Sequence, residues 1–150
     1  MRFNFSLLVS LAAAALAPVA TASCSEAQRF GVLQVVPSTL AQGDSFTVHV
    51  DLACSAELGY LPTYMDYYIE VLSNNNGHEA PILLARRDYR LNGTGLSPAD
   101  TFTAELPHWF YFADAKYSVV FVNSFSKPGP NNNNVITTGS IAVPLNITGI

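Results

Sequence analysis

Aromatic side chains are the groups in this sequence best suited to binding chemistry, because they gather in two places. One is an unbroken run of five ring-bearing residues, His108-Trp109-Phe110-Tyr111-Phe112. The other is a group of tyrosines, Tyr60, Tyr64, Tyr67 and Tyr68. Tryptophan and tyrosine rings offer an apolar face with a polar tip, which suits stacking on a sugar ring or anchoring a partner protein. We therefore expect a binding platform formed by Trp109, Tyr111, Tyr60 and Tyr64.

The platform depends on how the run is folded. If its backbone is extended, successive side chains alternate between faces, so Trp109 and Tyr111 share one face and Phe110 and Phe112 share the other. One pair then belongs in the core, and the other forms a flat, exposed surface. The alternative is that both pairs pack into the core and its lid, with only the tyrosine hydroxyls reaching out.

No residue pattern indicates a catalytic or metal site. The three histidines, His49, His78 and His108, are far apart in sequence and lack a His-Glu-x-x-His motif or a cysteine cluster. The sequence also lacks a Gly-x-Ser-x-Gly elbow, a phosphate-binding glycine loop and the Asp-x-Asp spacing of a calcium loop. We expect no enzymatic activity, no metal and no cofactor.

Charged residues leave two further possibilities. Glycoside hydrolysis needs a pair of carboxylates, and the sequence singles out no pair among Asp66, Glu70, Glu79 and Glu105. Arg86-Arg87-Asp88 falls in an expected strand, so its two arginines point to opposite faces. We interpret one of them as part of a cross-strand ion pair rather than an anion site.

The first 22 residues are typical of a secretory signal peptide. Arg2 precedes an apolar run from Phe5 to Ala17, and Ala20-Thr21-Ala22 supplies small residues before a cleavage site after Ala22. The run is too short to span a bilayer comfortably, and the C-terminal residues do not form the signal for a GPI anchor. We expect a secreted product in which residues 23–150 form one domain, with no membrane span and no GPI anchor.

Covalent features agree with an extracellular location. In an oxidising compartment the two cysteines, Cys24 and Cys54, favour a single disulfide over two free thiols. Two Asn-x-Thr sequons, at Asn92 and Asn146, are candidate glycosylation sites.

Composition narrows the class of protein. Of 150 residues, 49% are hydrophobic and only 12% are charged, which excludes a wholly disordered chain. Seven Lys and Arg against eleven Asp and Glu give a net charge of −4, so we expect no nucleic-acid partner. The length fits one domain.

Hydrophobic residues recur with a period of two almost throughout, which predicts strands and no helix after residue 22. The pattern in Ser45–Cys54 places Cys54 on the inward face of its strand. Apolar residues on both faces of Lys116–Phe125 indicate a central strand. We expect a break near Gly139-Ser140 in the last strand. The seven expected strands are Phe30–Val36, Ser45–Cys54, Tyr67–Val71, Pro81–Tyr89, Thr101–Leu106, Lys116–Phe125 and Val135–Ile147.

Seven strands separated by Gly, Pro and Asn turns predict an all-β protein, an antiparallel sandwich of the immunoglobulin or fibronectin III kind. Asp114-Ala115-Lys116-Tyr117 resembles the tyrosine corner of such domains. Val119 occupies the position of their second core cysteine, and the third strand has no tryptophan. A jelly roll or a small β-barrel is the alternative fold.

The mature chain resembles small secreted proteins of filamentous, mushroom-forming fungi. The resemblance is carried by Asn74-Asn75-Asn76-Gly77-His78-Glu79, Leu83-Leu84-Ala85-Arg86-Arg87 and Phe112-Ala113-Asp114-Ala115. It implies a secreted single domain and no mechanism. A more distant similarity, over Pro37–Val50 only, links the chain to the Kre9/Knh1-like domains of fungal cell walls.

Two functional hypotheses follow. The first is a non-catalytic extracellular module at the cell wall or cell surface, whose partner is a wall polysaccharide or an extracellular protein. The second is a small secreted hydrolase or effector without a recognisable catalytic motif, which requires a concave pocket with convergent polar groups.

Overall fold

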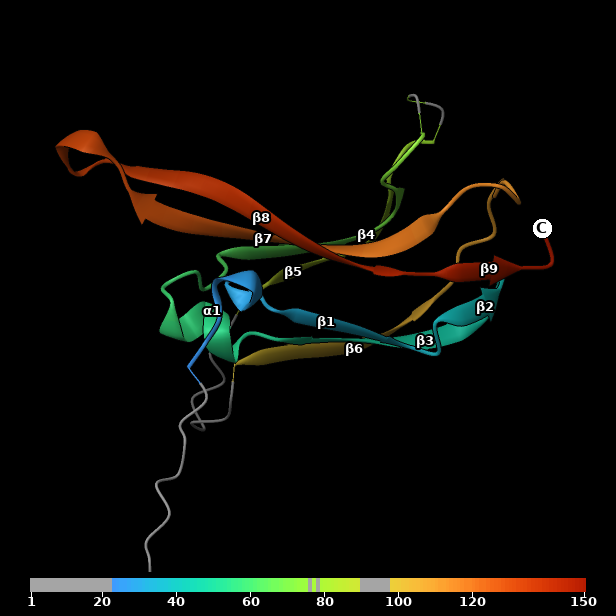
Figure 1. The fold of residues 1–150 in the computed structure, drawn as a ribbon, viewed down its shortest axis with the longest axis horizontal. Helices are drawn as coiled ribbons and strands as arrows, with labels where there is room; N and C mark the ends of the chain where they lie inside the picture. Colours follow the sequence, from blue (N-terminus) through green and yellow to red (C-terminus); the bar gives the residue numbers. More distant parts are fainter. Residues whose placement is uncertain (1–22, 76, 78, 90–97) are drawn as a thin grey trace, which may run out of the picture.

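Two β-sheets packed face to face make up the fold in the computed structural model, which describes residues 23–75, 77, 79–89 and 98–150 (Figure 1). One sheet has the strand order β1-β3-β6, formed by β1 (Val32–Val36), β3 (Ser45–Asp51) and β6 (Ala99–Glu105). The other has the order β5-β4-β7-β8, formed by β4 (Tyr64–Val71), β5 (Ile82–Asp88), β7 (Tyr117–Pro128) and β8 (Asn134–Pro144). Every pairing within these two sheets is antiparallel.

The alternating pattern in the sequence explains most of these strands. In β3, Phe46, Val48 and Val50 are buried, whereas Thr47 is exposed on the other side. In β7 both Val119 and Val120 are buried, because this strand lies between β4 and β8. The predicted central strand is therefore confirmed.

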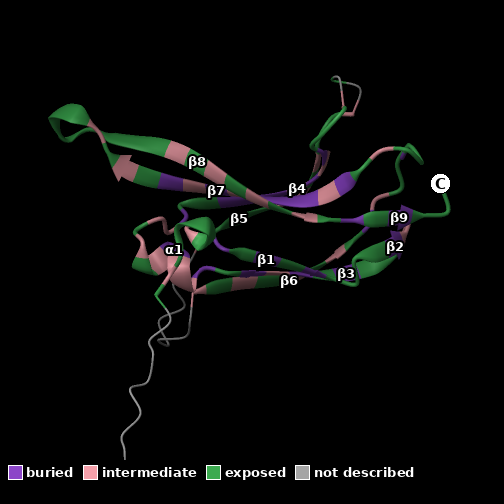
Figure 2. Ribbon diagram, viewed as in Figure 1, coloured by how far each residue is buried: buried purple, intermediate pink, exposed green. Residues whose placement is uncertain are grey.

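The core lies between the two sheets, and both contribute to it (Figure 2). Tyr67 and Phe121 are completely buried at its centre, with their ring centroids 5.1 Å apart. The other completely buried apolar residues are Val48, Val50, Leu52, Leu106 and Val119. Neither sheet closes into a barrel, so the predicted all-β sandwich is confirmed and the barrel alternative is wrong.

A tyrosine corner joins the sheets at one end. Tyr117 opens β7, and its hydroxyl accepts a hydrogen bond from the backbone N–H of Phe112 at 3.0 Å. A tyrosine at the start of this strand that bonds back to the preceding loop is a mark of immunoglobulin-like sandwiches. The structure thus supports the resemblance seen in residues 114–117.

Several predicted elements need correction. Cys54 does not continue the β3 strand, because residues 53–57 turn into the short helix α1 (Ala53–Glu57). The predicted break near Gly139 is also wrong, since β8 runs through it and ends before Leu145. Two short strands, β2 (Thr39–Ala41) and β9 (Asn146–Thr148), form a parallel pair, and 3-10 turns occur at η1 (Glu26–Gln28) and η2 (Pro130–Asn132). The described chain therefore has nine strands instead of seven.

The β7–β8 hairpin is longer than the sheet that carries it. Strand β4 pairs with β7 only as far as Ser124, whereas β8 stays paired with β7 to Pro128. Residues 125–138, which we call the arm, therefore project beyond the sandwich (Figure 1). The loop between β6 and β7 lies at the opposite end of the molecule.

Candidate functional site

The expected disulfide is present. Cys24 and Cys54 are bonded, with their Cα atoms 5.2 Å apart. Their side chains are half-buried, so the bridge does not lie in the core as the strand assignment of Cys54 implied. It ties the start of the described chain to α1, and it agrees with an oxidising compartment.

The predicted platform is not assembled as expected. Trp109 is 54% exposed, but Tyr111 is only 9% exposed and belongs to the core cluster. The reason is that residues 106–112 do not form a strand, so the alternation that placed the two rings on one face does not apply. Pro107, two residues after the end of β6, is the sequence signal for this change.

The two remaining platform residues lie elsewhere. Tyr60 packs edge-on against Phe30 and Phe125, and the Lys127 ammonium sits 3.7 Å from the centre of its ring. Tyr64 is exposed at the start of β4, where it pairs with Ser124 of β7. The structure therefore does not bring them together with Trp109.

A different aromatic group is exposed in their place. Phe110 is 82% exposed and Phe112 is 55% exposed, and both lie in the same loop as Trp109. We call residues 107–116 the aromatic loop. The ring centroids of Trp109 and Phe110 are 6.2 Å apart with their planes at 63°, so the surface that they form is angled and not flat.

Two tyrosines hold the aromatic loop in place. The Tyr111 hydroxyl donates to the backbone oxygen of Pro107 at 3.0 Å, and the Tyr117 hydroxyl accepts from the Phe112 N–H at the same distance. The two tyrosine rings meet edge to face, 5.2 Å apart. The backbone N–H of Trp109 also donates to the side-chain oxygen of Gln42 at 3.1 Å. The exposed rings thus stand on a loop that is fixed before any ligand arrives.

The surroundings of Tyr111 and Tyr117 change the pKa values of their hydroxyls. Burial raises the pKa of Tyr111 to about 12, and the neighbouring Tyr117 adds to the effect. Burial also raises the pKa of Tyr117, the bond from the Phe112 N–H lowers it, and the carboxylates of Glu79 and Asp114 raise it further. Both hydroxyls therefore keep their protons at neutral pH.

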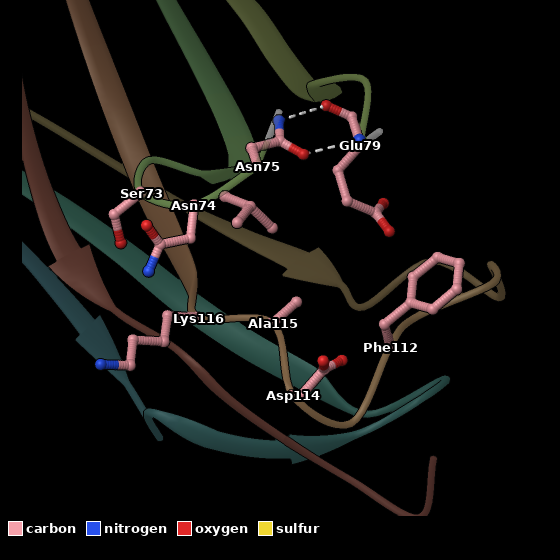
Figure 3. Close-up of a pocket in the computed structure, with 9 residues that line it drawn as sticks. Ser73, Asn74, Asn75, Glu79, Phe112, Asp114, Ala115 and Lys116 are labelled. Carbon is pink, nitrogen blue, oxygen red and sulfur yellow. Dashed lines mark hydrogen bonds between the residues drawn. The ribbon is translucent and has the colours of Figure 1, made fainter. Parts of the chain in front are cut away.

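A pocket of about 450 Å³ adjoins the aromatic loop (Figure 3). It lies between Phe112 and the turn that follows β4. The turn is held by Asn75, whose side-chain amide bonds to the backbone N–H and oxygen of Glu79 at 2.7 and 2.8 Å. Polar and charged side chains share its lining with Phe112, namely those of Ser73, Asn74, Asn75, Glu79, Asp114 and Lys116.

The close-up shows how the charged groups of the pocket point. Glu79 extends its carboxylate toward the segment that carries Phe112 and Asp114. Lys116 extends away from both carboxylates. One side of the pocket therefore combines an aromatic ring with two acceptors, a juxtaposition that the sequence did not single out.

The arginines of β5 are held in ion pairs. Arg86 bonds to both carboxylate oxygens of Asp66 at 2.7 and 2.9 Å, directly across the strand pair, as predicted. This bond lowers the pKa of Asp66. Arg87 bonds to Asp100 of the opposite sheet at 2.6 Å, and the buried Tyr67 hydroxyl donates to the same oxygen at 2.9 Å. A second pocket of about 400 Å³ beside these residues thus holds arginines that are already neutralised.

Other predicted features are placed as follows. Asn146 is exposed on β9, and the Thr148 hydroxyl of its sequon donates to the backbone oxygen of Leu40 at 3.2 Å. The expected signal peptide, the Asn92 sequon and His78 lie outside the described residues. The His49 ring lies 2.7 Å from the Thr101 hydroxyl, within the β3–β6 pair.

Three further findings concern metal binding, membrane crossing and similarity to known proteins. Among the described residues, no three His, Cys, Asp or Glu side chains are grouped so that they could hold a metal ion. In the same part of the chain, no helix has the length and apolar character needed to cross a bilayer. The chain matches no protein-family model and no curated protein.

Proposed function

We propose that the protein is a secreted, non-catalytic module that binds carbohydrate of a cell wall or cell surface through the aromatic loop and the adjoining pocket. The observation that carries the proposal is the position of Phe112. Its ring belongs both to the exposed aromatic group and to the lining of the polar pocket.

The chemistry of a sugar explains why this combination matters. A pyranose ring has an apolar C–H face that stacks on aromatic rings and a rim of hydroxyls that need hydrogen-bond partners. Phe112 and Trp109 offer the first kind of contact. Glu79, Asp114 and Asn74 offer the second on the same end of the sandwich.

Preorganisation favours binding at this end. Exposed apolar rings on a soluble protein mark interaction surfaces, and a loop that is ordered beforehand loses little entropy when a ligand arrives. The hydroxyl bonds of Tyr111 and Tyr117 supply that order. The disulfide supports secretion, because such bonds persist in oxidising compartments.

The angle between the rings narrows the ligand. Because the Trp109 and Phe110 planes differ by 63°, they fit a chain whose successive sugars turn relative to one another better than the flat face of a crystalline polymer. We expect binding to soluble β-1,3-glucan to exceed binding to crystalline chitin.

Affinity electrophoresis with soluble β-glucan and mannan, together with pull-down on chitin, tests the proposal. Trp109→Ala and Phe112→Ala should each weaken binding about five-fold, the equivalent of about 1 kcal/mol for one aromatic contact. Tyr64→Ala is the matched control, because it removes an exposed ring from a strand outside the site. If no polysaccharide is retained, or if the control loses binding equally, the proposal is wrong.

One observation favours a second candidate, a hydrolase acting on the bound chain. The pocket brings the carboxylates of Glu79 and Asp114 to one site beside an aromatic ring, and glycoside hydrolysis uses such a pair. Release of reducing sugar that disappears in both Glu79→Gln and Asp114→Asn would select this candidate. Binding without release selects the non-catalytic module.

A further inference from the structure

The arm offers an interaction surface unrelated to the aromatic loop. It is a two-stranded ribbon, residues 125–138, at the opposite end of the molecule, and most of it is exposed (Figure 2). Each strand of such a ribbon has an outer edge whose backbone N–H and C=O groups can pair with another strand. The two edges of this arm differ in how they are protected.

The β7 edge is covered by the protein itself. The Thr63 N–H donates to the backbone oxygen of Ser124 at 2.6 Å, where the arm begins. Farther out, the Lys127 ammonium donates to the backbone oxygen of Gly59 at 2.8 Å and lies against the Tyr60 ring. Pro128, at the end of the strand, has no N–H to offer. A second chain therefore has no access to this edge.

The β8 edge has none of these protections. Within the described chain, β8 is hydrogen-bonded only to β7, so no strand is paired with its outer side along the arm. From Asn131 to Pro144 the sequence contains no charged residue. Its outer part is rich in β-branched residues, Val135, Ile136, Thr137 and Thr138, and Val135 and Ile136 are both about half exposed. The other edge of the same sheet, β5, carries Arg86, Arg87 and Asp88, which is the usual defence of an exposed strand.

We propose that β8 of the arm pairs antiparallel with β8 of a second copy of this chain, joining two four-stranded sheets into one. An antiparallel pairing about a two-fold axis is self-complementary, because the same neutral segment meets itself. The chain as a whole carries a net charge of −4, which repels a second copy, but residues 124–144 carry no acid and only one base, Lys127. The arm also projects beyond the sandwich, so two arms can overlap while the bodies stay apart.

The length of the free edge sets the strength of this contact. It extends over about five residues, Asn134–Thr138, up to the point where Phe30 packs against Gly139. Such an interface lies at the small end of the range for specific complexes. Dimerisation should therefore depend on concentration and should be seen at high micromolar and not at nanomolar protein.

Sedimentation equilibrium over a wide concentration range tests the proposal, with Thr138→Lys and Ile136→Lys as disrupting variants. Ile136 is at the middle of the free edge, so Ile136→Lys brings like charges together at the two-fold axis and should raise the dimer dissociation constant at least about tenfold. Thr138→Lys places one charge at each end of the paired segment and should raise the constant by a smaller factor. Ser126→Lys is the matched control, since Ser126 lies opposite Ile136 on the β7 strand of the same arm. It should dimerise like the unchanged protein. Melting temperatures establish that every variant is folded.

Four outcomes overturn the proposal. These outcomes are that the unchanged protein stays monomeric at all concentrations, that the disrupting variants dimerise normally, that the control variant also loses dimerisation, and that the chain forms open-ended polymers instead of a closed dimer. None of these measurements involves carbohydrate, so the result is independent of the proposed ligand.

Discussion

Tyr117→Phe removes one oxygen atom and tests whether the tyrosine corner holds the aromatic loop. The aromatic ring remains, so the edge-to-face contact with Tyr111 is kept. The Phe112 N–H loses its acceptor in a half-buried position. A net hydrogen bond contributes about 1 kcal/mol, and an unsatisfied buried donor costs about 1–3 kcal/mol. Because water can partly reach this loop, we expect a loss of about 1–2 kcal/mol, or about 4–8 °C in melting temperature for a domain of this size.

Three measurements follow from this reasoning. Thermal unfolding gives the loss of stability, hydrogen exchange of the Phe112 amide should become faster, and affinity for soluble β-glucan should fall because the loop must be ordered on binding. Tyr64→Phe is the control, since it removes the same atom from an exposed ring on β4. If the two variants melt alike and the Phe112 amide exchanges at its original rate, this bond does not hold the loop.

Three further predictions concern stability. Cys54→Ser opens a loop with a sequence separation of 30 residues and should cost about 3–4 kcal/mol, which thermal unfolding would show as a fall of about 10 °C or more. Arg86 lowers the pKa of Asp66, so this ion pair stabilises the fold above the ordinary pKa of the carboxyl group, and the benefit is lost as the pH falls. In Asp66→Asn the denaturant concentration at the unfolding midpoint should therefore fall less steeply as the pH is lowered. The pKa of Tyr111 is raised in the folded state, so the stability of the fold should decrease as the pH rises from about 10 to 12. The denaturant midpoint of Tyr111→Phe, measured over the same pH range, should decrease less.

Local pattern was enough to predict the sandwich. Period-two alternation identified β3 and β7, because a strand with one buried face must alternate and a central strand may be apolar on both. An even cysteine count sufficed for the disulfide, since two thiols allow one pairing. Glycine was among the residues expected at the turns, and Gly43, before β3, has a φ of +86° that suits glycine.

Local pattern failed where tertiary contacts decide the outcome. Helix α1 has only five residues, too few to show a helical period, and Cys54 happened to continue the alternation of the preceding strand. In the aromatic loop, Tyr111 is buried because it meets Tyr117, and Phe110 is left outside by the path of the loop. The pocket between Phe112 and Glu79 joins residues that are far apart in sequence, and the contact between Tyr111 and Tyr117 depends on the path of an irregular loop, so neither follows from local pattern.

The parallel pairing of β2 with β9 has a mechanical consequence. Thr39, Leu40 and Ala41 lie in register with Asn146, Ile147 and Thr148, close to the C-terminus (Figure 1). With the Cys24–Cys54 bond intact, β2 lies inside the closed loop, so tension between the chain ends passes through the disulfide and bypasses the β2 backbone. Once the bond is reduced, the same tension pulls the two parallel strands past each other, so their bonds must break together instead of unzipping one at a time. Resistance to such a force depends on the unfolding barrier rather than on equilibrium stability. The disulfide therefore shields the β2–β9 pair from a pull on the chain ends, and its reduction exposes the pair to that load.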